Sequence, residues 1–167
     1  MATRRAFLNR VALGLGVVAC RGAFAQPAEG AAYVGVETSA STGQSQARFF
    51  TASGATRGIA PLDFRAHGMA QHANRVVVFP RRPGTRFALI APDTLEVIGV
   101  VVAPENRHFY GHGAFTVDGR HLLVTENDLD TLAGGIGVYD TTDLRRLGKI
   151  ALPGSGPHEI VRALRGD

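Results

Sequence analysis

The sequence predicts an all-β fold of the β-propeller class, and two observations carry this prediction. Three histidines, His67, His112 and His158, recur 45 and 46 residues apart, each within a similar local phrase. A repeat of this length is typical of a propeller blade. Within each repeat, apolar runs of strand length alternate with turn residues, and no stretch after residue 25 keeps a helical period. We therefore expect about two and a half to three blades, each an antiparallel four-stranded sheet.

The first 25 residues predict a twin-arginine signal peptide, which is absent from the mature protein. An arginine pair at residues 4 and 5 precedes an apolar run over residues 11–19, and residues 23–25 (Ala-Phe-Ala) offer a cleavage site. The apolar run is too short to span a membrane. We expect export to the periplasm and an incomplete propeller domain over residues 26–167.

The leader also accounts for the basic charge of the chain. It holds four arginines and no acidic residue, so the formal net charge of +4 disappears with it and leaves fourteen basic and fourteen acidic residues. Nucleic acid is therefore not an expected partner. The one cysteine, Cys20, also lies in the leader, so the mature chain has no thiol for a disulfide, a metal or a nucleophile. As an alternative, Cys20 ends a lipobox and attaches the protein to a lipid anchor.

The strands of the repeats follow from the apolar runs and the turns between them. The best-preserved repeat predicts strands over residues 112–117, 121–125, 136–139 and 147–152. Asp118-Gly119 joins the first two as a hairpin turn. The preceding repeat predicts strands over residues 67–72, 76–79, 87–90 and 97–102, with Ala73-Asn74 at the turn. Asn74 and Gly119 both tolerate left-handed backbone, which suits these turns. An earlier, weaker repeat predicts strands over residues 33–36 and 48–51.

Four segments, residues 103–113, 125–128, 136–140 and 156–159, carry a resemblance to a known family. They resemble the exported bacterial propeller family of domain of unknown function 1513, from about Tyr33 to Val161. The resemblance implies a seven-bladed propeller related to YVTN-repeat and quinoprotein-dehydrogenase-like proteins, with no established activity. It also implies several further blades after Glu159.

The three repeated histidines are the first candidate site. Equivalent positions in successive blades lie at one height around the propeller axis, so His67, His112 and His158 are expected near the central channel. Convergent imidazoles would suit a transition metal or an anionic ligand. In the alternative, each histidine makes a repeated structural hydrogen bond to the neighbouring blade. Gly68 and Gly113 suit a close approach of the backbone in either case.

The segment before His112 adds further candidates. We expect His108 and Tyr110 in the crossing between two blades, where they would share a ligand-binding pocket with His112, and Glu159 would join it from the side of His158. Phe109 is expected in the core. The alternative is an aromatic pair that only seals the seam between sheets.

Two charged segments complete the candidate sites. Glu126, Asp128 and Asp130 are expected in the loop after a second strand, where their oxygens would bind Ca²⁺ or simply face solvent. Arg81, Arg82 and Arg86 form a basic counterpart in the preceding repeat. These arginines would bind a carboxylate or pair with the acidic loop.

Two classes of function fit these residues. Motifs of serine hydrolases, P-loop nucleotide-binding proteins, dinucleotide-binding proteins and zincin proteases are absent from the sequence. The first hypothesis is a periplasmic module that binds a small molecule, a metal or a protein partner at the histidines. The alternative is a metal- or cofactor-dependent oxidoreductase or a lactonase-like enzyme, with the same histidines as ligands or bases. An incomplete propeller with open strand edges and no activity is the third possibility.

Overall fold

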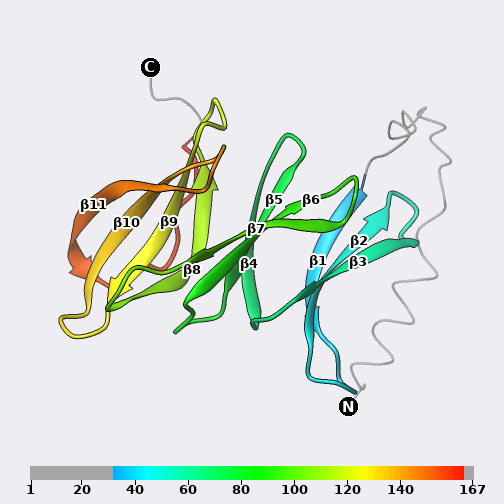
Figure 1. Cartoon of the computed structure of the whole chain (residues 1–167), viewed down its shortest axis with the longest axis horizontal. Helices are drawn as coiled ribbons and strands as arrows, with labels where there is room; N and C mark the ends of the chain where they lie inside the picture. The colour runs from blue at the N-terminus through cyan, green and yellow to red at the C-terminus, as the bar shows by residue number, and fades with distance from the viewer. Residues whose placement is uncertain (1–31, 164–167) are drawn as a thin grey trace, which may run out of the picture. The chain divides into compact units, whose positions relative to one another are not determined.

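Every regular element of the structure, a computed structural model that describes residues 32–163, is a β-strand (Figure 1). This confirms the predicted all-β class. The strands are β1 (Ala32–Thr38), β2 (Ser45–Thr51), β3 (Thr56–Leu62), β4 (Ala66–His72), β5 (Arg75–Pro80), β6 (Arg86–Ala91), β7 (Glu96–Val102), β8 (Arg107–Phe115), β9 (His121–Asp128), β10 (Ala133–Asp140) and β11 (Arg146–Ser155). The predicted signal peptide and Cys20 lie outside the described residues. Within those residues, no helix has the length and hydropathy needed to cross a membrane.

The strands form three antiparallel sheets in chain order. The first sheet has the order β1-β2-β3, the second β4-β5-β6-β7, and the third β8-β9-β10-β11. The two four-stranded sheets coincide with the two predicted blades. In the first sheet the prediction missed β3, because this strand carries exposed polar residues at its start and Pro61 near its end, which are poor strand signals.

Apolar cores fill both seams between consecutive sheets. One cluster joins the first and second sheets, and it consists of Ala47, Phe49, Ala60, Leu62, Val76, Val78, Ala88 and Ile90. The other joins the second and third sheets, and it consists of Val77, Phe79, Phe87, Leu89, Val101, Phe109, Phe115, Leu122, Val124 and Tyr139. The second sheet therefore buries apolar side chains on both faces, which is how stacked blades hold together. Phe109 lies in the core as predicted.

One strand boundary differs from the prediction. The strand β8 begins at Arg107, five residues before the predicted start, because a bulge interrupts its alternating pattern and hides the first half of the strand. At the turn between β4 and β5, Ala73 takes the left-handed backbone (φ 47°), and at the turn between β8 and β9 Gly119 takes it (φ 67°). After β11, residues 156–163 form no strand.

Candidate functional site

The three repeated histidines lie against one another. His67 comes from β4, His112 from β8, and His158 from the segment that follows β11. The ring centroids of His67 and His112 are 5.0 Å apart, and those of His112 and His158 are 5.1 Å apart. His112 is therefore the centre of a continuous row of imidazoles, which we call the histidine cluster.

Bulges in β4 and β8 orient the side chains of His67 and His112. His67 is the extra residue between Ala66 and Gly68 in the pairing of β4 with β5. His112 lies in the interval between Phe109 and Gly113, where β8 shifts its register against β9. Bulges redirect side chains in this way next to many functional sites.

Thr125 of β9 holds the irregular backbone at His112. Its hydroxyl accepts a hydrogen bond from the His112 amide at 3.3 Å and donates one to the His112 carbonyl oxygen at 2.9 Å. Thr125 is fully buried, so these bonds replace the strand ladder where the bulge interrupts it. We infer that Thr125 positions His112 without being part of the binding surface.

Two glycines allow β4 and β8 to come close enough for the histidines to meet. A methyl group at Gly68 would overlap the carbonyl oxygen of Gly111 and lie 3.3 Å from Nδ1 of His112. At Gly111, which has a φ of 105°, a methyl group would lie 2.8 Å from Cδ2 of His67. The close approach that the sequence predicted at Gly68 is therefore confirmed, and it is the reason that His67 reaches His112.

Replacing Gly68 with alanine is expected to separate β4 from β8. The added methyl group meets backbone, which cannot rotate away, so the free energy of unfolding should fall by about 1–3 kcal/mol. Urea denaturation followed by circular dichroism measures this loss, and histidine NMR signals report the altered imidazole row. Gly154→Ala is the matched control, because a methyl group there has no neighbour within 4 Å among the described residues. Equal losses in both variants would contradict the steric argument.

Burial and its neighbours favour the neutral form of His112. Burial lowers the pKa of His112 below its ordinary 6.5, the interactions with His67, His158 and Arg82 lower it further, and Glu159 opposes them. A neutral imidazole has one donor and one acceptor nitrogen. The Nε2 atom of His112 is buried and has no hydrogen-bond partner among the residues that the structure describes. One polar position of the cluster therefore remains unsatisfied.

His108 and Tyr110 lie within β8, so the prediction that they occupy a crossing loop is wrong. His108 is buried, and its Nδ1 lies 3.2 Å from the carbonyl oxygen of Phe109. The ring of Tyr110 is 5.6 Å from that of His108, and the guanidinium carbon of Arg82 lies 4.7 Å from its centroid on one face. Arg82 therefore makes a cation–π contact with Tyr110, and the binding of a carboxylate by Arg82 stays a prediction.

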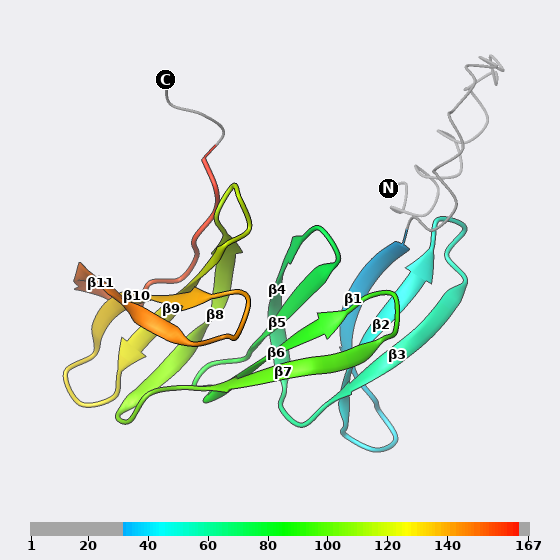
Figure 2. The same ribbon diagram turned by 45° about the horizontal axis from the view of Figure 1, so that its top comes forward.

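Tyr110 also contacts the turn that leads to His158. A methyl group at Gly156 would lie 2.7 Å from the Tyr110 hydroxyl oxygen, and the Gly156 amide donates a hydrogen bond to Oδ1 of Asn127 at 3.0 Å. These contacts bring the segment after β11 back beside β8 (Figure 2). Tyr110 and Asn127 thus help to place His158 next to His112.

A groove of about 330 Å³ opens beside the histidine cluster. Residues 112–115 of β8 and residues 69–72 of β4 form two of its walls, and residues 159–162 form the third. His112 therefore belongs to both the groove and the histidine cluster, and Glu159 lines the groove directly after His158. His158 and Glu159 are exposed, whereas His112 is half-buried, so the groove gives access from solvent to the middle of the row.

Glu126 does not belong to a solvated acidic loop, and this prediction is wrong. It lies in β9 and is fully buried. Its Oε2 accepts bonds from Nε of Arg107 at 3.0 Å and Nη2 of Arg146 at 2.8 Å. Its Oε1 accepts the hydroxyl of Tyr139 at 2.7 Å. Burial and the bond to Glu126 raise the pKa of Tyr139 far above its ordinary value. Glu126 is thus the acceptor of a buried ionic network that joins all four strands of the third sheet.

The other two residues of the predicted acidic loop shape a turn. Oδ1 of Asp128 accepts hydrogen bonds from the amide and the hydroxyl of Thr131, both at 2.9 Å, and these bonds lower the pKa of Asp128. Oδ2 of Asp130 accepts a hydrogen bond from the side-chain amide (Nδ2) of Asn106 at 2.7 Å. Within residues 32–163, no three His, Cys, Asp or Glu side chains lie close enough to hold a metal ion together. Calcium and transition-metal binding stay predictions.

Comparison with known proteins now decides the family. Residues 60–167 match the family described as Protein of unknown function (DUF1513). The chain belongs to this family. The resemblance inferred from the motifs is therefore confirmed. No curated protein matches the chain significantly.

Solved structures similar to this DUF1513 chain share its fold. The dihydro-heme d1 dehydrogenase NirN in complex with DHE matches 77% of the chain with a TM-score of 0.62 and 19% identity. The Kuenenia stuttgartiensis hydrazine synthase matches 68% of it with a TM-score of 0.58 and 14% identity. The chain spans 26% of the first structure and 32% of the second. At these identities the likeness shows the fold alone, and it confirms a partial β-propeller.

Several residues of the DUF1513 site escaped the sequence analysis. Arg107 and Arg146 belong to no recognisable sequence motif. Only the pairing of the strands brings them to Glu126, their common partner. Thr125 looked like an ordinary strand residue, although it directly precedes the acidic run. Arg82 was predicted as a basic residue, but its contact with Tyr110 was not predicted.

Proposed function

We propose that this chain is part of a periplasmic β-propeller that binds a small anionic ligand at the histidine cluster. The observation that carries the proposal is the buried Nε2 atom of His112, which lacks a hydrogen-bond partner among residues 32–163. A buried polar atom without a partner is costly, by about 1–3 kcal/mol. A ligand oxygen that accepts a hydrogen bond from this atom would remove that cost. The predicted twin-arginine leader supports the periplasmic location.

The charges around His112 favour an anion over a cation. Arg82 is permanently charged, and His67 and His158 place two further imidazoles against His112. Glu159 supplies the opposing negative charge. The groove beside the cluster has room for a small molecule that reaches His112 from solvent. Imidazole and guanidinium groups together suit a carboxylate, sulfate or phosphate group.

Sulfate is a suitable first probe, because its charge is constant between pH 5 and pH 8. We expect saturable binding by isothermal titration calorimetry, measured against NaCl at equal ionic strength. His112→Gln should weaken the affinity by about tenfold or more, which corresponds to about 1.4 kcal/mol. His121→Gln is the matched control, because His121 lies in β9 outside the cluster. Identical affinities in both variants would show that the cluster is not the site.

Acidification is expected to strengthen anion binding and to destabilise the free protein. The pKa of His112 in the folded protein lies below its ordinary 6.5, so the unfolded chain binds more protons near that pH. The stability that His112 contributes is therefore present above pH 6.5 and is lost as the pH falls below it. An anion favours the imidazolium and opposes this loss. Thermal unfolding at about pH 5.5 and 7.5, with and without sulfate, measures both effects. A sulfate effect that does not grow on acidification would contradict the prediction.

A metal- or cofactor-dependent enzyme is the second candidate function. The lowered pKa of His112, at the centre of the imidazole row, favours it, since a neutral imidazole acts as a metal ligand or a general base. One similar structure is named a dehydrogenase, although the likeness to it concerns the fold. Elemental analysis of protein purified from periplasm separates the candidates. Stoichiometric metal that disappears in His112→Gln would favour the enzyme, and turnover of a substrate would then have to be shown.

A further inference from the structure

Three segments of the chain bound the groove beside the histidine cluster along its length. They are residues 69–72 of β4, residues 112–115 of β8 and residues 159–162 after β11. Each segment begins within two residues of one member of the histidine cluster, so all three lead away from the cluster. Beyond the cluster, the ring centroids of His72 and Phe115 are 5.8 Å apart. The groove thus extends from the histidine cluster to the contact between His72 and Phe115, which we call its far end.

The groove is longer than a small anion. From His112 to Phe115, β8 advances by three residues, which corresponds to about 10 Å at the rise of an extended strand. A sulfate or acetate ion at His112 would therefore occupy only one end of the groove. A ligand that fills it must be extended, and the second end of this ligand would lie beside Phe115.

Apolar side chains line the groove between its two ends. Met69 is 38% exposed and Val161 is 73% exposed, and both line the groove together with Ile160. Gln71, a polar residue of the same groove, uses its side-chain amide locally, since this amide donates a hydrogen bond to the Ala73 carbonyl oxygen at 2.7 Å. Exposed apolar side chains in a groove with polar ends favour an apolar ligand segment. We therefore expect the middle of the ligand to be an alkyl chain.

Arg162 places a positive charge at the far end. It is the last of the residues 159–162 that line the groove, and it is exposed. In the part of the chain that the structure describes, Arg162 forms no ion pair with an acidic side chain. Guanidinium groups bind carboxylates through two parallel hydrogen bonds. The far end is thus suited to an acidic group of the ligand.

We infer that the groove binds a linear dicarboxylate, with one carboxylate at His112 and the other at Arg162. The alkyl chain between them lies against Met69, Ile160 and Val161. Suberate (octanedioate) is long enough to span about 10 Å when its chain is extended. This inference rests on the proposed function, because it adds a second binding position to the anion site at His112. It narrows the ligand from any small anion to one chemical class.

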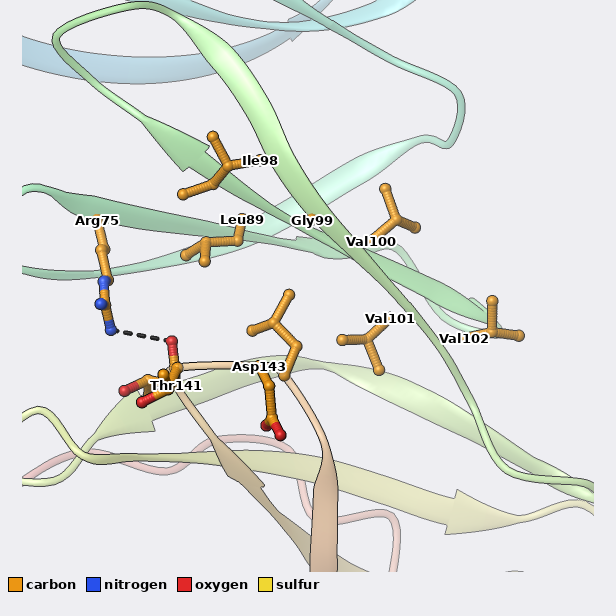
Figure 3. A pocket seen from close by; sticks show the side chains of 11 residues that line it. Arg75, Leu89, Ile98, Gly99, Val100, Val101, Val102, Thr141 and Asp143 are labelled. Atoms are coloured by element: carbon orange, nitrogen blue, oxygen red, sulfur yellow. Dashed lines mark hydrogen bonds between the residues drawn. The ribbon is translucent and has the colours of Figure 1, made fainter.

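A larger groove, of about 560 Å³, lies beside β7 and is less suited to a dianion (Figure 3). Among the described residues that line it, Arg75 is the single basic side chain. Its guanidinium donates a hydrogen bond to the Thr141 carbonyl oxygen at 2.9 Å. Asp143 lines the same groove and would repel a carboxylate. The histidine cluster therefore remains the better position for a dicarboxylate.

Isothermal titration calorimetry with suberate, octanoate and succinate at equal ionic strength tests this inference. We expect suberate to bind about tenfold more tightly than octanoate, which lacks the second carboxylate, and than succinate, which is too short to reach Arg162. Arg162→Gln should remove the advantage of suberate over octanoate. It should leave sulfate binding nearly unchanged, because salt screens charges that are about 10 Å apart. Arg57→Gln is the matched control, because Arg57 is an exposed arginine of β3 outside the groove.

Sulfate separates a failure of this inference from a failure of the proposed function. If sulfate did not bind, or if His112→Gln left its affinity unchanged, the proposed function would fail and the dicarboxylate site with it. If sulfate binding required His112 but suberate bound no more tightly than octanoate, the dicarboxylate inference alone would be wrong. It would also be wrong if Arg57→Gln weakened suberate binding as much as Arg162→Gln.

A last probe, ω-aminooctanoate, tests the sign of the charge that the far end accepts. Its ammonium group replaces the second carboxylate of suberate, and Arg162 would repel it. We therefore expect ω-aminooctanoate to bind more weakly than octanoate in the wild type, and the difference to shrink in Arg162→Gln. Binding tighter than that of octanoate would show that Glu159 selects an ammonium group, and it would overturn the inference.

Discussion

Replacing Glu126 with alanine is expected to lower the free energy of unfolding by about 3–5 kcal/mol, because the change leaves buried cations without their counter-charge. The side chain of Arg107 is 8% exposed and that of Arg146 is 28% exposed, and both bind Glu126. The Arg107 guanidinium already has one buried nitrogen, Nη2, without a partner in the described residues. Removal of the carboxylate would also leave the buried hydroxyl of Tyr139 without its acceptor.

Urea denaturation followed by circular dichroism measures this loss, and Glu37→Ala is the control. Glu37 pairs with Arg48 at 2.5 Å, but both side chains are exposed to solvent, 43% and 30% respectively. Solvent screens such pairs, so the control should unfold close to wild type. If both variants lost the same stability, burial of the Glu126 network would not be the cause. Because the network joins β8 to β11, we also expect the Glu126→Ala variant to broaden the NMR signal of His112.

The fold was largely predictable because its signals are local. A hairpin turn such as Asp118-Gly119 and the apolar runs beside it depend on residues close in sequence, and the predicted strands of the second and third sheets coincide with β4–β7 and β8–β11. The 45- and 46-residue spacing of the histidines was likewise sufficient to expect them together. Equivalent residues of successive repeats occupy equivalent positions in successive blades. A regular spacing in the sequence therefore predicts that these residues lie close together in the structure.

The rest of the site depends on contacts between residues far apart in sequence. Arg107 and Arg146 meet Glu126 across 19 and 20 residues, and no short pattern announces either pair. A run of acidic residues normally predicts a loop, so Glu126 was predicted in a loop that binds Ca²⁺ or faces solvent, although it lies buried in β9. His108 and Tyr110 were misplaced for a related reason. The bulge in β8 breaks the two-residue alternation by which a strand is recognised.

Replacing Phe109 with alanine is expected to cost about 3–5 kcal/mol and to loosen the seam between the second and third sheets. Phe109 is fully buried, and its ring lies 4.9 Å from that of Phe87 and 6.4 Å from that of Tyr139. Phe87 belongs to the second sheet, so this aromatic group spans the seam that also brings His67 to His112. The cavity left by the missing Phe109 ring would thus weaken both the core and the histidine cluster. Urea denaturation measures the first effect, and the affinity for sulfate measures the second. Tyr33→Ala is the control, because Tyr33 is 68% exposed and its loss leaves no cavity. If Phe109→Ala lowered stability but bound sulfate as tightly as wild type, the cluster would be held by β4 and β8 alone, through the close approach at Gly68 and Gly111.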